Sequence, residues 1–163
     1  MRSKGGIPVT INEMTQKQCR ELLARSRVGR LGCSLDNQPY VVPVYFAYDA
    51  DYIYVFTTLG QKVEWMRQNP RVCMQVDETN AAGWVSVISN GRYQELVEPG
   101  FVEERAHAQK LLETYHGWWL NALAERHMKS PDDMAIAPVF FRIHIDSITG
   151  LSATKIDAPL RPV

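Results

Sequence analysis

Short runs in which apolar and polar residues alternate recur along the chain, and a period of two residues predicts β-strands. The runs read RLGCSL, PYVVPVYFAY and YIYVFTT in the first half, followed by RVCMQVDE, WVSVISNGRYQELV and VFFRIHIDSITGLSA. In the last run, Phe141, Ile143 and Ile145 share one side, and polar residues stand between them. The pattern therefore predicts about six strands with a buried face.

Turn residues and prolines indicate how these strands are connected and ordered. Turns that contain Asp, Asn and Pro, at LDNQP and YDADY, separate the first three runs. Pro39 and Pro43 lie inside the second run, and a proline cannot donate to a strand ladder. We therefore expect this strand at a sheet edge or with an irregular path. Asn90-Gly91 predicts a bend within the fifth run.

Three segments show helical patterns. The first begins after Thr15, a plausible N-cap, and is expected to end near Val28-Gly29. The second is short, from Gln61 to Gln68, and is closed by Asn69-Pro70. The third runs from Gly100 to Lys129, with an expected break at His116-Gly117. Strands with interspersed helices, and no repeat or linker, predict one α+β, mainly β domain over residues 1–163. A small barrel or closed sheet is expected, with a loose Pro-rich C-terminal tail.

Composition narrows the function classes only modestly. Hydrophobic residues make up 45% and charged residues 22% of 163 positions, as in a globular domain. The 18 basic and 18 acidic residues cancel, which argues against broad electrostatic binding to nucleic acid or anionic lipid. No apolar run is long enough for a membrane span, and the N-terminus shows no apolar signal segment. Three cysteines without a C-x-x-C pair fit reduced thiols, so a cytoplasmic location is expected.

The best candidate for an anion site is the segment TTLGQK, which ends the third strand and opens the short helix. Thr57 and Thr58 supply hydroxyls, Gly60 lets the backbone approach a ligand, and Gln61-Lys62 start the helix. Free N–H groups and the helix dipole favour a phosphate at such a position. The glycine spacing matches neither a P-loop nor a dinucleotide fingerprint, and ordinary turn chemistry is the alternative interpretation.

Two strand segments are candidates for holding a planar heterocycle. Along Val42-Pro43-Val44-Tyr45, the proline frees a backbone edge that can hydrogen-bond the carbonyl and imide groups of a flavin ring. A protected edge strand explains the same pattern. Trp84 and Ser86 can supply an aromatic lid and a hydroxyl, and Arg92 a cation. Trp84 as core filling is the alternative.

The histidines do not predict a metal site. His107, His116 and His127 are spaced by nine and eleven residues, which does not give the i, i+4 pair of a helical metal site. His144 stands on the polar face of the last strand, facing either a ligand or water. The pair Trp118-Trp119 is expected to anchor the long helix or a subunit interface.

The blocks from VGRLGCSLDNQPYVVPVYFAY to VCMQVDE, then WVSVISNGRYQEL and FFRIHIDSITG, resemble the flavin-binding split-barrel family related to pyridoxamine 5'-phosphate oxidase. The branch of small flavin-nucleotide-binding and nitroimidazole-resistance proteins is the most similar. The resemblance covers about residues 14–151 and implies a six-stranded split β-barrel with flanking helices. It also implies a homodimer with flavin mononucleotide (FMN) in two clefts between the subunits.

Carried over by position, the resemblance implies that one group of residues borders the flavin ring and another holds its phosphate. The ring group is Val42, Pro43, Val44, Tyr45, Trp84 and Ser86; the phosphate group is Thr57, Thr58, Gln61 and Lys62. Arg142 and His144 are candidates for contacts from the partner chain.

Two departures from the family pattern argue against specific activities. Phe56 stands where nitroimidazole-resistance relatives often carry a histidine, which weakens a nitroreductase assignment. Gln61-Lys62 replaces the arginine-lysine pair of true pyridoxamine phosphate oxidases, and their arginine-rich C-terminal signature is not found, so vitamin B6 oxidation is not expected.

The expected function is an FMN-dependent oxidoreductase that passes electrons from a reduced nicotinamide or deazaflavin donor to a small acceptor. No catalytic side chain is assigned, because the flavin itself carries out the redox chemistry. A non-enzymatic flavin- or haem-binding protein for storage or sensing is the alternative. A dimeric scaffold without a functional cofactor site is a third hypothesis.

Overall fold

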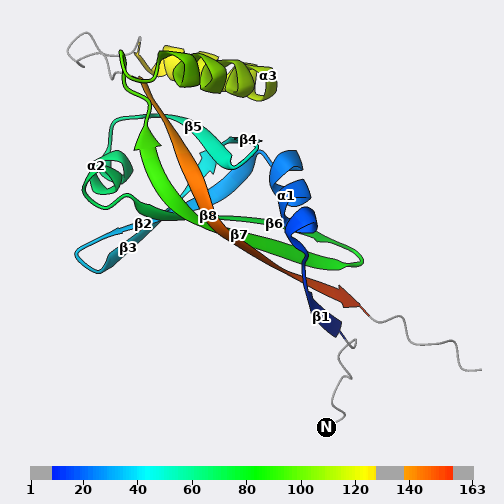
Figure 1. Ribbon diagram of the computed structural model, residues 1–163. Coiled ribbons are helices and arrows are strands. Elements are labelled where there is room, and N and C mark those ends of the chain that lie inside the picture. The colour runs from blue at the N-terminus through cyan, green and yellow to red at the C-terminus, as the bar shows by residue number, and fades with distance from the viewer. Residues whose placement is uncertain (1–8, 128–137, 156–163) are drawn as a thin grey trace, which may run out of the picture.

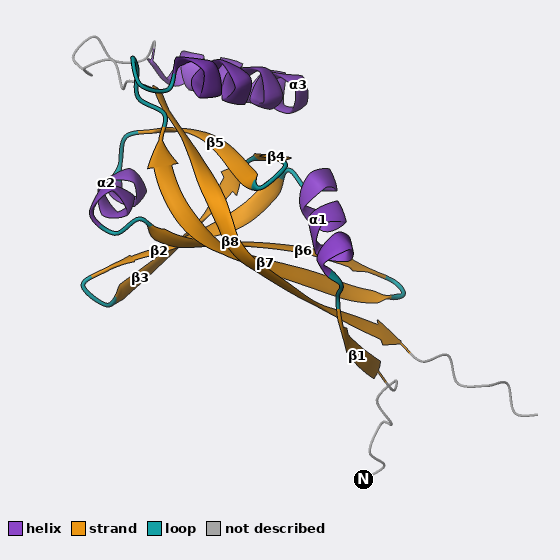
Figure 2. Cartoon of the chain, in the orientation of Figure 1, coloured by secondary structure: helices purple, strands orange, loops and turns teal. Residues whose placement is uncertain are grey.

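One antiparallel sheet, built around the two long strands β7 and β8, organises the chain (Figures 1 and 2). The computed structural model describes residues 9–127 and 138–155, and over 115–127 it describes the helix without its side chains. The described strands are β1 (Val9–Glu13), β2 (Val28–Leu35), β3 (Gln38–Tyr45), β4 (Ala47–Asp49), β5 (Tyr52–Thr58), β6 (Arg71–Asn80), β7 (Gly83–Glu95) and β8 (Pro138–Lys155). The helices are α1 (Gln16–Arg25), α2 (Gln61–Gln68) and α3 (Val102–His127).

The strand order is β3-β2-β6-β7-β8-β5-β4, and β1 pairs with the far end of β8. The two ends of this order, β3 and β4, follow each other in the chain but are not paired among the described ladders, so the sheet is open there. The mainly β, α+β class is therefore correct, and the arrangement is consistent with a split barrel. The prediction of a fully closed sheet is wrong.

The predicted number of six strands is also wrong, because the described residues form eight. The second predicted run divides at Phe46, because the residues before it pair with β2 and those after it pair with β5. The extra strand β1 has exposed side chains throughout, and a strand without a buried face gives no alternation signal. The other strand predictions are confirmed, including the position of β3 at a sheet edge.

The bend predicted at Asn90-Gly91 is confirmed as a shift of register between β7 and β8. Gly91 permits the close approach of the two backbones at this point. A Cβ atom there would lie 2.2 Å from the carbonyl oxygen of His144, so any other residue would push the strands apart.

The helix predictions hold for α2 and in part for α1 and α3. Thr15 caps α1 in a capping box with Gln18, as the sequence indicates, but α1 ends at Arg25 because Ser26 already has an extended backbone. The break predicted at His116-Gly117 is absent, since α3 continues to His127. A glycine inside a helix costs about 1 kcal/mol relative to alanine, which long helices tolerate.

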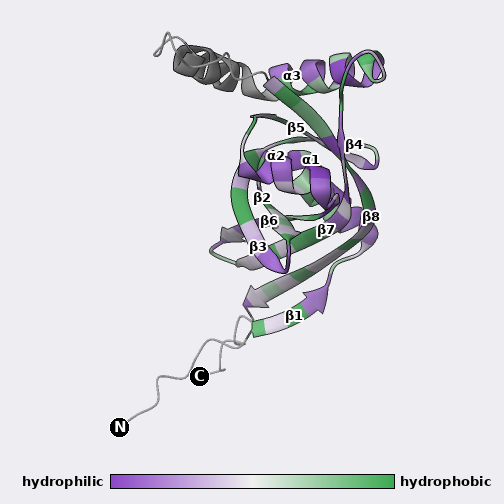
Figure 3. Cartoon of the chain, turned by 90° about the vertical axis from the view of Figure 1, so that its left-hand side faces the viewer, coloured by the Kyte–Doolittle hydropathy of each residue, from purple (hydrophilic) through white to green (hydrophobic). Residues whose placement is uncertain are grey.

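Two clusters of buried side chains hold these layers together. The larger one fills the inside of the curved sheet, with Leu22 and Leu23 of α1 and Val63 and Met66 of α2 packed against it. The smaller one lies beneath α3, where Ala108 and Leu112 meet residues of β4, β5 and β8. Polar residues dominate the outer surface of α1 and α2 (Figure 3). Among the described residues, no helix is long and apolar enough to span a membrane.

Candidate functional site

Thr57 and Thr58 are the last residues of β5 and lie just before the N-terminus of α2, as the sequence predicts. The carbonyl of Gly60 accepts hydrogen bonds from the N–H groups of Val63 (2.9 Å) and Glu64 (3.2 Å), which close the first turn. No side chain caps this helix. Its first N–H groups are therefore available to an anion, and the dipole of α2 favours one. We call residues Thr57–Lys62 the phosphate loop.

Lys62 is the distinctive charge of the phosphate loop. Its side chain is half-buried, and no carboxylate lies within ion-pair distance of it among the described residues. Burial lowers the pKa of the Lys62 ammonium, and a smaller interaction with Cys33 acts in the opposite direction. A buried charge without a counter-charge is unfavourable, so this ammonium is ready to accept an anionic partner.

Space for such a partner exists above Gly60. A Cβ atom added at Gly60 would meet nothing within 4 Å, so the backbone faces open volume. Thr57 is 9% exposed, and its hydroxyl has only a long contact of 3.4 Å to the carbonyl of Thr58. A hydroxyl, an uncapped helix start and an ammonium thus lie within six residues of the chain, and these groups are of the kinds that bind a phosphate.

The strand wall predicted beside the phosphate loop is present. Pro43, Val44 and Tyr45 line a groove of about 150 Å³ together with Val28 and Phe56. Phe56 comes from β5, the same strand that ends in Thr57 and Thr58, so this groove and the phosphate loop are neighbours along one strand. That the groove and the phosphate loop form one cofactor site stays a prediction.

Val42, also predicted to border the ring, instead packs in part against the main core. It pairs with Leu31 of β2, and its neighbour Pro43 pairs with Arg30. In a strand, neighbouring side chains point to opposite faces. Pro43 is exposed accordingly, whereas Val42 is half-buried.

Trp84 and Ser86 lie elsewhere in the single chain. They line a separate hollow of about 510 Å³ between the start of β7, the C-terminal part of β8 and the segment that enters α1. Exposed apolar side chains also line it: Trp84, Ile88 and Leu151. The structure therefore does not bring Trp84 and Ser86 together with the groove at β3 within one subunit.

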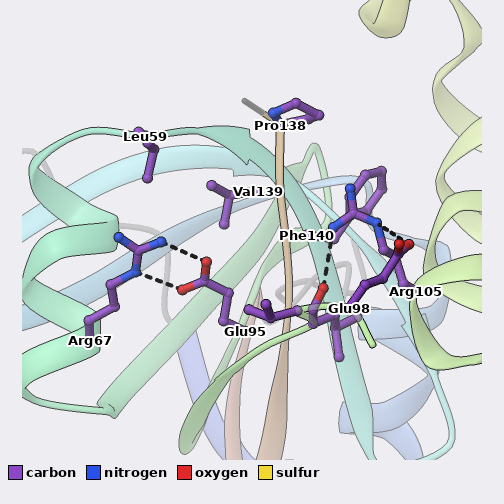
Figure 4. A pocket seen from close by; sticks show the side chains of 10 residues that line it. Leu59, Arg67, Glu95, Glu98, Arg105, Pro138, Val139 and Phe140 are labelled. Atoms are coloured by element: carbon purple, nitrogen blue, oxygen red, sulfur yellow. Dashed lines mark hydrogen bonds and ion pairs between the residues drawn. The ribbon is translucent and has the colours of Figure 1, made fainter. Parts of the chain in front are cut away.

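A third cavity, of about 290 Å³, adjoins the phosphate loop at Leu59 (Figure 4). Arg67 of α2 donates two hydrogen bonds of 2.7 Å to the carboxylate of Glu95. This guanidinium lowers the pKa of Glu95, and burial together with Glu95 raises the pKa of Tyr93. Sequence reasoning missed this cavity because its residues come from α2, β7, β8 and α3, and no local motif marks it.

The polar residues of β8 that were candidates for cofactor contacts are engaged within the chain. Arg142 donates from Nε to Gln94 at 2.6 Å and lies over the ring of Tyr52 at 4.4 Å. His144 and Arg92 both pair with Asp146, at 3.1 Å and 2.9 Å. Among the described residues, no group of His, Cys, Asp and Glu side chains can hold a metal ion. The side chains of His116, Trp118, Trp119 and His127 lie outside the described part.

Comparison with known proteins gives consistent results. A 37% identical, uncharacterised protein of Rhizobium meliloti matches 88% of this chain and 95% of its own length. The crystal structure of a FAD-binding protein from Mesorhizobium loti is 39% identical, covers 91% of this chain and 100% of that one, and superposes with a TM-score of 0.74. A FAD-binding protein from Mycobacterium smegmatis, at 19% identity, shares the fold with a TM-score of 0.60 over 88% of this chain and 98% of that one.

The sequence profile of one family matches residues 15–152, which is most of the chain and includes the phosphate loop and the groove at β3. The chain belongs to the pyridoxamine 5'-phosphate oxidase family.

Proposed function

We propose that this protein binds a flavin through its FMN portion, with the phosphate at the phosphate loop and the ring along the groove at β3. The observation that carries the proposal is Lys62, a half-buried ammonium without an acidic partner among the described residues, beside the uncapped start of α2. The similarity to the FAD-binding protein from Mesorhizobium loti supports the same cofactor class.

Each part of the site has a defined task in this proposal. Lys62 and the N–H groups at the start of α2 neutralise the phosphate, and the hydroxyls of Thr57 and Thr58 with the amide of Gln61 add hydrogen bonds. The groove lined by Pro43, Val44 and Tyr45 excludes water from one face of the ring. The flavin, when bound, supplies hydride and electron transfer, and the chain orients it.

We further propose that the protein acts as a homodimer. The hollow that contains Trp84 and Ser86 is lined by exposed apolar side chains, and such a surface favours burial against a second copy. In the dimer, Trp84 and Ser86 of the partner subunit border the flavin, so the cofactor cleft lies between subunits. Sedimentation of Trp84→Glu tests this: a dimer that persists unchanged contradicts the assignment of this surface.

The reaction proposed for the bound flavin is electron transfer from a reduced nicotinamide or deazaflavin to a small acceptor. The free thiols of Cys19, Cys33 and Cys73 support a reducing, cytoplasmic setting. Anaerobic mixing with each donor tests the reaction. Bleaching of the flavin bands within seconds supports an enzyme, whereas no bleaching with any donor supports a flavin carrier.

The cofactor assignment is tested by titrating the apoprotein with FMN and recording the visible spectrum. Lys62→Ala is expected to weaken FMN binding about a hundredfold, since a charge-assisted contact to a phosphate is lost. Lys17→Ala is the matched control, because Lys17 is exposed and pairs only with Glu21 on α1. Unchanged affinity in Lys62→Ala contradicts the phosphate assignment. A Soret band in place of flavin bands indicates haem, and a colourless protein that binds no flavin indicates a scaffold.

A further inference from the structure

The cavity of about 290 Å³ at Leu59 has no role in the FMN site described above (Figure 4). Leu59 lines this cavity and directly precedes Gly60, so the cavity borders the phosphate loop. We propose that the cavity is an adenosine subsite, which receives the adenosine half of a dinucleotide whose phosphates occupy the phosphate loop. This inference rests on the proposed function, because the same Lys62 positions those phosphates.

The charges of the cavity favour a neutral ligand group. Arg67 is neutralised by Glu95 through two hydrogen bonds, and Arg105 pairs with Glu98 at 3.4 Å. Two positive and two negative side chains therefore leave no excess charge for a second anion. A nucleoside is neutral, and its amino and hydroxyl groups can donate to the carboxylate of Glu98, whose side chain is 62% exposed.

The walls of the cavity offer both apolar contact and a stacking surface. Leu59 and Val97 line it with side chains that are 45% and 55% exposed, which is unfavourable unless a ligand covers them. The guanidinium of Arg105 lies 4.7 Å from the centre of the Phe140 ring and is partly exposed to the cavity. A guanidinium plane is a good stacking partner for a nucleobase.

The size of the cavity limits the ligand to part of a dinucleotide. Its volume of about 290 Å³ is at the lower end of the roughly 300–1,000 Å³ typical of sites for whole small molecules. A nucleoside fits that space, and the flavin ring has its own groove at Pro43, Val44 and Tyr45. The adenosine can belong to FAD itself or to a nicotinamide dinucleotide that approaches a bound FMN.

The test compares dissociation constants of FMN and FAD for the wild type, Val97→Glu and Val102→Glu. Val97 and Val102 are almost equally exposed, but only Val97 lines the cavity, so Val102→Glu is the matched control. If the adenosine belongs to FAD, the wild type binds FAD at least about tenfold more tightly than FMN. Val97→Glu removes that preference while FMN affinity stays within about twofold.

The second arm of the test titrates ADP-ribose into FMN-loaded protein. If the adenosine belongs to the electron donor, FAD binds no more tightly than FMN. ADP-ribose then binds to the FMN-loaded protein, and Val97→Glu weakens ADP-ribose binding about tenfold. Equal affinity for FMN and FAD together with no ADP-ribose binding overturns the subsite and leaves the flavin site intact. A wild type that binds neither flavin overturns the proposed function and the subsite with it.

Discussion

Lys62 in the phosphate loop and Arg142 beneath α3 are both cations that the fold withdraws from water, but their surroundings differ. Arg142 is 13% exposed and has a hydrogen bond to Gln94, an aromatic ring at Tyr52 and a carboxylate at Glu104. Lys62 is half-buried and has none of these among the described residues. The chain therefore completes the surroundings of one cation and leaves the other incomplete.

This difference separates a structural charge from a binding charge. A satisfied buried cation stabilises the fold, because its desolvation is offset by its partners. An unsatisfied one destabilises the unliganded fold, and a ligand recovers that free energy on binding. We therefore assign Arg142 to the attachment of α3 and Lys62 to the cofactor. The following substitutions can break or sharpen this distinction.

The largest effect on stability is expected for Arg142→Met, which removes the cation that joins β8 to Gln94 and to the rings beneath α3. The free energy of unfolding should fall by about 2–4 kcal/mol, since a hydrogen-bonded, partly desolvated charge is lost. Thermal unfolding measures it. Arg92→Met is the control on the neighbouring strand. Arg92 pairs with Asp146 at the surface, so its loss should change the unfolding temperature little. A drop in flavin affinity with Arg142→Met would contradict its structural role.

The next largest effect on stability is expected at Glu95, a carboxylate for which the chain also provides a partner, Arg67. Arg67 lowers its pKa in the folded state, so its contribution to stability is complete above the ordinary glutamate pKa of about 4.3 and is lost as pH falls through the lowered value. Glu95→Gln should cost about 1–2 kcal/mol at neutral pH and flatten the acid limb of the stability profile. Urea unfolding from pH 7 to pH 3 measures this. An acid limb as steep as in the wild type contradicts it, with exposed Glu103→Gln as the control.

Gly60→Ala should affect binding more than folding. The new methyl group occupies the open space above the phosphate loop, so FMN affinity should fall roughly three- to tenfold, or about 1 kcal/mol. Stability of the apoprotein should stay equal or rise slightly, since alanine restricts the unfolded chain. Gly100→Ala is the control, because a Cβ atom there would meet only one ordinary contact, 3.7 Å from the carbonyl oxygen of Val97, and Gly100 lies outside the phosphate loop. Unchanged FMN affinity in Gly60→Ala places the phosphate elsewhere.

The smallest expected effect is a change in the stability of the apoprotein with pH in the alkaline range. Burial lowers the pKa of Lys62, so the folded state releases this proton before the unfolded state does. Stability should therefore rise with pH between the lowered value and the ordinary lysine value of about 10.4, relative to Lys62→Met. Saturation with FMN should remove this difference, since the phosphate favours the charged ammonium. A difference of the same size with FMN bound contradicts the pairing.

Much of the fold follows from local patterns in the sequence. Thr15, the prolines of β3 and Asn90-Gly91 act through their own backbone chemistry, so their roles are readable in the sequence. The strand β1 escapes detection because both of its faces are exposed. The division at Phe46 depends on a change of pairing partner from β2 to β5, which the run itself does not encode.

The parts of the candidate site differ in how far the sequence alone reveals them. The phosphate loop is one continuous segment, and the groove at β3 is another, so both were visible in the sequence. Within the described part of the chain Lys62 has no acidic partner; this depends on which side chains surround it, and only the folded chain shows it. The cavity at Leu59 joins Arg67, Glu95 and Arg105 from separate elements, and no spacing along the chain reveals it.

The most direct test of the central claim measures two properties of Lys62→Met: the unfolding temperature of the apoprotein and the dissociation constant of FMN. Methionine keeps the length of the side chain and removes its charge. If the Lys62 ammonium serves to bind the ligand, the two properties should change in opposite senses. The unfolding temperature of the apoprotein should stay equal or rise, and the affinity for FMN should be about a hundredfold weaker. A lower unfolding temperature with unchanged FMN affinity would show that Lys62 is a structural residue and contradict the account.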